Sequence, residues 1–235
     1  YQETSLPPAL ECESHDLHIG SSSGGHDNAS DAFPTQSVVS NLIILVSGTF
    51  VIDKNITFDN CYLFFDENAE LATSGVVDLV GIGSTFTHCD KAWKGIRINA
   101  DGAIRLFDCT IRGAWRGIDL KRNYRAAMSM LYFNSFFQCQ YGITALEPLT
   151  DVFFSEFVLN SFWGMGAVPG TTVKPRSGIR LLNSRAIIGT PVVNGDPTDY
   201  YLYTNQFINL HFGIEAFGGI VHVSNCWFQH MRPEP

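Results

Sequence analysis

The chain has 235 residues, of which 45% are hydrophobic and 16% are charged, and its formal net charge at pH 7 is −8. The hydrophobic content excludes a disordered chain, and the negative charge argues against a nucleic-acid partner. Every apolar run is far shorter than the roughly 20 residues that a membrane-spanning helix needs, so we expect no membrane span.

The first 37 residues are predicted to form an extended N-terminal arm. Residues 1–37 carry few large apolar side chains and include the run Ser-Ser-Ser-Gly-Gly, which is typical of a linker. Cys12, His15 and His18 follow one another at three-residue spacing and could bind a metal ion. We favour a polar segment without metal, because it offers no second pair of ligands to complete a four-coordinate site.

A single β-rich domain is predicted from residue 38 to residue 231, and we expect it to continue beyond the C-terminus in a larger parent protein, because the sequence stops directly after a repeat phrase without an obvious cap. The run at its start, residues 37–52, is rich in β-branched side chains, and we expect it to cap the open end of a solenoid. Further along, residues 93–98 read Trp-Lys-Gly-Ile-Arg-Ile, and residues 115–120, 22 positions later, read Trp-Arg-Gly-Ile-Asp-Leu. A period of this length indicates stacked coils, and the alternation of apolar and polar residues favours strands over helices.

A shorter phrase sets the expected register of these coils. It consists of Asn or Asp, then Cys or Ser, then any residue, then an apolar residue, and degenerate copies fill the gaps. Its second residue, taken as an anchor, occurs at eight positions, which predicts about eight coils. The predicted anchors are residues 61, 84, 109, 135, 156, 184, 206 and 226.

The columns beside the anchors have different expected roles. Two places after the anchor the residue is apolar, as at Leu63, Phe86 and Phe137, and is expected to point inward. One place before it, Asn and Asp prevail, and we expect them to form a ladder of turns rather than a catalytic site. This second column consists of Asn60, Asp108, Asn134, Asn183, Asn205 and Asn225.

Aromatic residues stand just before glycines in several coils, as Trp93 does before Gly95 and Trp115 before Gly117. Such rings could stack on sugars, or they could cover the glycines where strands bend. We favour packing at the bends, because aromatic side chains commonly fill the gaps that glycines leave in curved sheets.

The six cysteines are widely dispersed, and no CxxC pair is present. This spacing indicates neither a zinc ribbon nor a dithiol redox site, and no metal or cofactor is predicted. Cys61, Cys109 and Cys226 stand at anchor positions, so we expect them to be small buried residues.

Over roughly residues 50–231, the coil length, the anchor phrase and the Gly-Ile strands resemble right-handed parallel β-helix repeat proteins of the pectate-lyase-like superfamily. More narrowly, GTFVIDKNITFDNCYLFF at 48–65, followed by CDKAWKGIRINADGAIRLFDCTI at 89–111, is similar to large secreted or surface β-helix proteins of Bacteroidota. The resemblance implies an all-β, right-handed parallel β-helix and an extracellular or cell-surface location. It leaves the function open, because this fold carries lyases, hydrolases, adhesins and passive stalks.

The catalytic patterns of that superfamily are not found in the chain. Its polygalacturonase-like members carry an Asp-Asp pair and a Gly-His-Gly phrase, its lyases carry an Arg-x-Pro-x-x-Arg phrase, and none of these three patterns is present. Arg97 and Asp119 are expected on neighbouring strands. We favour a surface ion pair between them over a catalytic dyad. No catalytic residue is assigned, and a polysaccharide lyase or glycoside hydrolase stays the alternative function.

The most distinctive feature is a basic stretch from Lys91 to Arg125. It contains nine of the fifteen Lys and Arg residues and only three acids, a local charge of +6 in a chain of −8. Such segregation can attract an anionic glycan or an acidic protein face, or it can be a solvated surface that prevents lateral aggregation. On the first interpretation, the protein is a secreted or cell-surface structural and binding module. The residues predicted to bind the ligand are Trp93, Lys94, Arg97, Trp115, Arg116, Lys121, Arg122 and Arg125.

Overall fold

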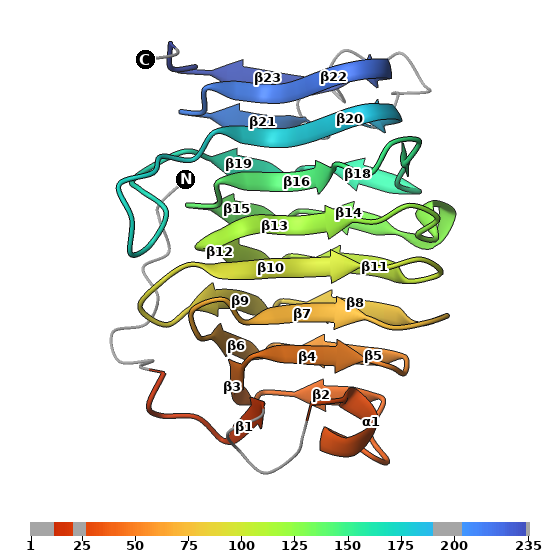
Figure 1. Ribbon diagram of the computed structural model, residues 1–235, viewed down its shortest axis with the longest axis vertical. Helices are drawn as coiled ribbons and strands as arrows, with labels where there is room; N and C mark the ends of the chain where they lie inside the picture. The colour runs from red at the N-terminus through yellow and green to blue at the C-terminus, as the bar shows by residue number, and fades with distance from the viewer. Residues whose placement is uncertain (1–11, 21–26, 190–203, 234–235) are drawn as a thin grey trace.

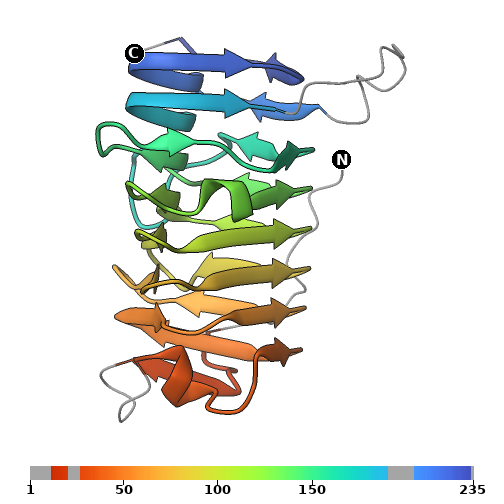
Figure 2. The same cartoon turned by 90° about the vertical axis from the view of Figure 1, so that its right-hand side faces the viewer.

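The computed structural model describes residues 12–20, 27–189 and 204–233. Within these ranges every strand pair is parallel, and helix is confined to α1 (Ala29–Ala32) and the 3₁₀ turn η1 (Ala126–Met128). The strands lie one above another along the long axis of the molecule (Figures 1 and 2). The predicted all-β class is confirmed, and the long parallel sheets are compatible with a parallel β-helix.

The strands form three sheets, here named A, B and C. Sheet A consists, in spatial order, of β1 (Leu17–Gly20), β3 (Ile43–Ser47), β6 (Tyr62–Phe65), β9 (Thr85–His88), β12 (Thr110–Arg112), β15 (Ser135–Phe137), β19 (Ser161–Trp163), β21 (Asn205–Ile208) and β23 (Cys226–Gln229). Sheet B consists of β4 (Thr49–Ile52), β7 (Glu70–Thr73), β10 (Trp93–Ile98), β13 (Ala114–Leu120), β16 (Tyr141–Ala145) and β20 (Ser177–Ile188), with β17 (Asp151–Val152) and β22 (Phe212–Val223) both paired to β20. Sheet C consists of β2 (Val38–Ser40), β5 (Ile56–Asp59), β8 (Asp78–Ile82), β11 (Ala103–Phe107), β14 (Met130–Tyr132) and β18 (Glu156–Val158).

The inward column of sheet A forms the centre of the core. Its rings stack in the later coils, where Phe162 lies 4.5 Å from Phe136 and 4.8 Å from Phe207 between ring centroids. Each fully buried aromatic or branched side chain stabilises the fold by about 1.5–3 kcal/mol. The column consists of Leu63, Phe86, Ile111, Phe136, Phe162 and Phe207, all at most 2% exposed.

Side-chain amides form a buried ladder in the anchor column. The Cys109 amide donates to Asn134 Oδ1 over 2.9 Å, Asn134 Nδ2 donates to Asn160 Oδ1 over 3.0 Å, and Asn160 Nδ2 donates to Asn205 Oδ1 over 3.1 Å. Each buried amide is thereby satisfied, and leaving one unpaired would cost about 1–3 kcal/mol. The anchors predicted at residues 135, 156, 184 and 206 are therefore wrong.

The shifted anchors change which side chains face inward. Successive strand residues point to opposite faces, so a slip of one residue turns a whole strand over. Phe136 and not Phe137 is buried in the core, and Phe137 stacks instead on Trp163 with 5.9 Å between ring centroids. The irregular step of 45 residues from Asn160 to Asn205 is the reason that the period could not be followed through the later coils.

The predicted turn geometry is present at four of the Asn and Asp positions. Asn60, Asp108, Asn183 and Asn225 have φ values between 47° and 53°, in the left-handed region that these residues tolerate. The turn prediction is confirmed at these positions.

Parts of the segment predicted as an extended arm are built into the stack. Strand β1 pairs with β3, and Cys12 forms a disulfide with Cys89. Beyond it, α1 leads to Phe33, whose ring lies 6.3 Å from that of Phe58. We call this N-terminal region, with Phe33 over Phe58, the closed end.

The cysteines lie in different environments. Cys61 and Cys109 are buried as expected, with burial raising the pKa of the Cys109 thiol to about 12. Cys226 is only half-buried, because it lies in the outermost strand of sheet A. Cys12 forms a disulfide and therefore has no free thiolate to bind a metal ion. Within the described ranges no group of three His, Cys, Asp or Glu side chains is placed to hold a metal ion.

Candidate functional site: the outer face of sheet B

The two copies of the Trp-x-Gly-Ile phrase lie on neighbouring strands, β10 and β13, but they are not in uniform register. Trp93 is paired with Ala114 and Gly95 with Arg116, and a bulge after Gly95 then restores the alignment of the two Ile residues. Gly95 is required here, since its φ is +118° and a Cβ would lie 1.5 Å from the Arg116 carbonyl oxygen. The two tryptophans consequently occupy different positions relative to the sheet.

Trp93 is a core residue. It is 0% exposed, stacks on Phe65 with 3.9 Å between ring centroids, and donates its indole N–H to the Arg112 carbonyl oxygen over 2.9 Å. The prediction that Trp93 binds a ligand is therefore wrong, and the alternative of packing at the bend is confirmed for this residue. Trp115, in contrast, is half-buried.

A column of polar residues runs along the outer face of sheet B. Its members succeed one another in register from β10 to β22, and they include side chains of both charges. Two of its carboxylates are nearly buried although they face outward, at 7% and 6% exposure. The column consists of Arg97, Asp119, Thr144, Arg180 and Glu215.

Asp119 is the centre of the first polar network. Its carboxylate pairs with Arg116 at 3.0 Å and Lys121 at 3.1 Å, and it accepts a hydrogen bond from the Thr144 hydroxyl at 2.7 Å. Arg97 is in register with Asp119 as predicted, but its ion pair is formed with Glu70 at 2.9 Å. The predicted Arg97–Asp119 pair is thus wrong, because both side chains have other partners.

Glu215 is the centre of the second network, which the sequence analysis did not find. Its carboxylate accepts hydrogen bonds from Arg176 Nη2 at 2.9 Å and from the Ser177 hydroxyl at 2.7 Å, and it lies 3.5 Å from Arg180 Nε. The Arg180 Nη1 group donates to the Tyr141 hydroxyl over 2.6 Å, and its guanidinium lies 4.8 Å above the Tyr141 ring. The sequence feature that could have located this network is the Gly-Ile-Arg phrase at 178–180, which repeats the phrase at 95–97.

The pKa of Glu215 results from opposing effects. Burial acts to raise it, because a charged carboxylate is less stable away from water. Hydrogen bonds from Arg176 and Ser177, together with the charges of Arg176 and Arg180, outweigh burial, so the pKa lies below its ordinary value. Glu215 is therefore held as a carboxylate with pre-ordered donors around it.

The basic stretch does not form one basic surface. The strands carry it around the stack, so that Arg105 lies in sheet C and Arg112 in sheet A, while Arg97 and Arg116 lie in sheet B. Acids from neighbouring coils pair with most of its members, as Asp78 does with both Arg105 and Arg125. The local charge of +6 along the sequence is largely neutralised in space.

Of the remaining predicted site residues, Lys121 is paired with Asp119 and, at 3.5 Å, with Glu147. Lys94 and Arg122 are exposed, and in the described part of the chain neither forms an ion pair. The structure therefore brings Arg97, Arg116 and Lys121 to one face and separates them from Arg125, which binds Asp78 and the Asp101 carbonyl oxygen.

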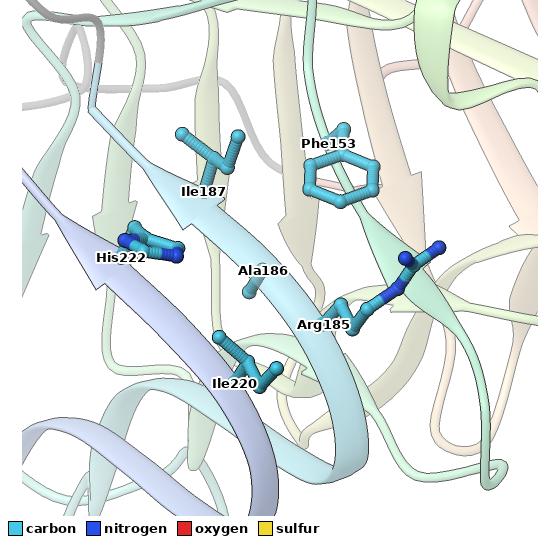
Figure 3. A pocket seen from close by; sticks show the side chains of 6 residues that line it. All are labelled: Phe153, Arg185, Ala186, Ile187, Ile220 and His222. Atoms are coloured by element: carbon cyan, nitrogen blue, oxygen red, sulfur yellow. The ribbon is translucent and has the colours of Figure 1, made fainter.

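A second feature is an apolar pocket of about 280 Å³ near the C-terminal end of the stack (Figure 3). It lies where β20 and β22 run side by side, and Phe153 borders it from the chain beyond β17. The guanidinium of Arg185 at its edge is held by both oxygens of Asp151, at 3.0 and 2.7 Å. The lining residues are Phe153, Arg185, Ala186, Ile187, Ile220 and His222.

No protein-family model, curated protein or solved structure matches this chain. Neither helix in the described ranges has the length and apolar composition that crossing a bilayer requires.

Proposed function

We propose that this protein is a secreted or cell-surface module with a structural and binding role, and that it binds a polysaccharide, rather than a protein partner, through the outer face of sheet B. The observation that supports the proposal most is the pair of networks around Asp119 and Glu215. They hold charged donors and acceptors in fixed positions on rigid strands, which lowers the ordering cost of binding. We further infer that the stack is a right-handed β-helix of about eight coils, since parallel crossover connections are overwhelmingly right-handed.

The chemistry of this face suits hydroxyl-rich ligands. Tyr141 and Trp115 are half-buried residues of neighbouring strands, and the Tyr141 ring lies 4.8 Å from the Arg180 guanidinium. Aromatic rings pack against apolar faces of sugars, while charged side chains exchange hydrogen bonds with hydroxyl groups. Because Arg97, Arg116 and Lys121 are already neutralised by acids of the protein, a neutral polysaccharide fits this face better than a strongly anionic one.

The disulfide supports the proposed location. A bond between Cys12 and Cys89 joins the N-terminal segment to sheet A. Structural disulfides persist in oxidising environments and are rare in the cytosol of most organisms. An extracellular or cell-surface site of action follows as part of the proposal.

Binding is favoured over the alternative of glycoside hydrolysis on this face. Asp119 and Glu215 are three strands apart in one column, which at about 4.8 Å per strand corresponds to on the order of 14 Å. Carboxyl pairs of glycosidases are separated by about 5–9.5 Å, and their general acid has a raised pKa. The pKa of Glu215 is shifted in the opposite direction.

Glycan-array binding of the full chain at low and high ionic strength tests the proposal. We expect retention on neutral polysaccharides that survives added salt, because screening weakens exposed charge contacts but not ring stacking. Tyr141→Ala and Trp115→Ala should each weaken binding by roughly tenfold, in line with about 1–3 kcal/mol for a well-placed aromatic contact.

Trp163→Ala is the matched control, since Trp163 is a half-buried aromatic residue on sheet A. Equal loss of binding in this variant, or no retention on any polysaccharide, would reject the proposed face. Release of unsaturated sugar ends that absorb in the ultraviolet, on incubation with acidic polysaccharides, would favour the lyase alternative instead.

A further inference from the structure

Apolar side chains line up on the outer face of sheet C, in the middle of the stack. Ile82, Phe107 and Tyr132 succeed one another in register on β8, β11 and β14. The residues just before them, at positions 81, 106 and 131, face the core, so these three side chains point outward. Each of the three strands has a paired neighbour on both sides (Figure 1), and their exposure therefore belongs to the face of the sheet and not to an end of the stack.

These outward side chains are well exposed for their size. Ile82 and Tyr132 are 43% and 37% exposed, and Phe107 between them is half-buried. Phe133, directly after Tyr132, adds a second exposed ring at 40%. Single apolar residues are normal on a protein surface, but large ones on adjoining strands form a contiguous patch, which is typical of an interaction site. We call these four residues the apolar stripe.

The backbone of Phe133 is strained where its ring is displayed. Phe133 occupies the corner between sheets C and A, where the three preceding coils place Asn60, Gly83 and Asp108. All four residues have φ between 53° and 60°. Gly, Asn and Asp tolerate this left-handed conformation, whereas a bulky side chain rarely adopts it. Because the side chain of Phe133 is only partly buried, packing offsets little of this strain, and strain of this kind is common at binding sites.

Acidic side chains border the apolar stripe. Asp59 continues the same column on β5, and Asp108 lies at the corner one coil before Phe133. Within the described ranges neither carboxylate forms an ion pair. Arg105, on β11, is already paired with Asp78. Aromatic ring faces and carboxylates both attract cations, so this border favours a basic partner.

The spacing of the apolar stripe suits an amphipathic helix. Adjacent strands are about 4.8 Å apart, so the side chains of the stripe recur at nearly the 5.4 Å pitch of an α-helix. Over the two steps from Ile82 to Tyr132 the mismatch is only about 1.2 Å. A helix laid along the stack can therefore set one apolar side chain over each strand.

We propose that the apolar stripe and its two bordering acids form a docking site for a basic amphipathic helix of a partner protein. Apolar side chains of the helix cover Ile82, Phe107 and Tyr132, and its Lys or Arg side chains pair with Asp59 and Asp108. A second copy of this chain fits less well, because its stripe would bring the same acids together in a chain of net charge −8. The site lies on sheet C, so it does not rest on the polysaccharide face of sheet B.

Fluorescence anisotropy of the full chain with a labelled synthetic peptide of Lys and Leu at helical spacing tests this inference. We expect the wild type to bind this peptide, with an affinity that falls as salt is added, and not to bind the same peptide with Glu in place of Lys. Phe133→Asn should weaken binding about tenfold, as expected for the loss of one well-placed aromatic contact. It should not lower the thermal midpoint, because Asn adopts the left-handed conformation readily.

Asp108→Asn is the second variant, since Asn occupies the same corner at position 60 with the same φ of 53°. It keeps the turn and removes one charge, so it should weaken binding by about threefold at low salt and reduce the salt dependence.

Leu149→Asn is the matched control. Leu149 is also an exposed apolar residue with positive φ, but it lies on the connection between β16 and β17 of sheet B. We expect this variant to bind the Lys peptide as the wild type does. Equal binding by the wild type and Phe133→Asn, or no binding by the wild type, would overturn the inference. So would a wild-type dimer or a polysaccharide retention that is lost in Phe133→Asn, because either would assign the stripe to another occupant.

Discussion

At the closed end of the stack, Phe33 covers Phe58 and leaves it 0% exposed, whereas at the opposite end of the described residues, formed by β22 and β23 and here called the open end, the equally inward-facing Phe228 is 43% exposed. The same type of side chain therefore contributes differently according to whether another layer lies over it. Burial, and not residue type, sets the stabilisation that each ring supplies. The closed end is further held by the Cys12–Cys89 disulfide, and no equivalent cross-link is found at the open end within the described residues.

The largest expected difference between the ends comes from removing one ring at each. Phe58→Ala should lower the free energy of unfolding by about 3–5 kcal/mol, since it leaves a cavity in a packed core. Phe228→Ala should lower it by only about 1–2 kcal/mol, because its ring is already partly hydrated. Urea denaturation of the two variants measures both values. Equal losses would show that Phe228 is covered as fully as Phe58 in solution.

Reduction of the disulfide should have the next largest effect. The bond spans 77 residues, and removal of a native disulfide typically costs about 2–4 kcal/mol. We expect Cys12→Ser to lower the urea midpoint, and a reducing agent to do the same to the wild-type chain but not to the variant. Cys226→Ser is the control from the open end, because Cys226 is a free, half-buried thiol. A midpoint that falls as far for Cys226→Ser would contradict the assigned roles.

The smallest expected effect is a pH dependence confined to the open end. The folded pKa of Glu215 lies below the ordinary 4.5, so its carboxylate stabilises the fold above that value, and the stabilisation is lost as pH falls through the folded pKa. Hydrogen exchange in β20 and β22 should therefore accelerate more than at the closed end as pH falls below about 4.5 and through the folded pKa, by a few-fold after correction for intrinsic rates. Glu215→Gln should reduce this extra pH dependence. Its persistence in the variant would assign the effect to another group.

The repeat phrases predicted the class of fold and several local features well. The alternation around Ile96 and Ile118 predicted strands, and Asn60 and Asp108 predicted left-handed turns, because both signals depend on short stretches of backbone. The register failed after Cys109. Asn134 and Asn160 carry the anchor position without the expected Cys or Ser, and a step of 45 residues then separates Asn160 from Asn205.

The candidate site was predicted less well than the fold. Arg97, Arg116 and Lys121 do lie on one face with Asp119, but the Arg176–Glu215 network was missed. Its partners are 39 residues apart in the chain, and no short window of sequence contains both. Trp93 and Trp115 occupy equivalent places in the repeated phrase, and only the bulge after Gly95 places one of them in the core.

The sequence by itself determined that this chain forms stacked strands with glycine and asparagine turns, because those preferences act between residues that are neighbours in the chain. The tertiary structure alone decided that the basic stretch is neutralised, since Glu70, Asp78 and Glu147 meet its cations across neighbouring coils. It also decided that Phe33 covers Phe58 at the N-terminal end of the core. Both outcomes depend on which coil lies next to which, a relation in space that the order of residues along the chain does not contain.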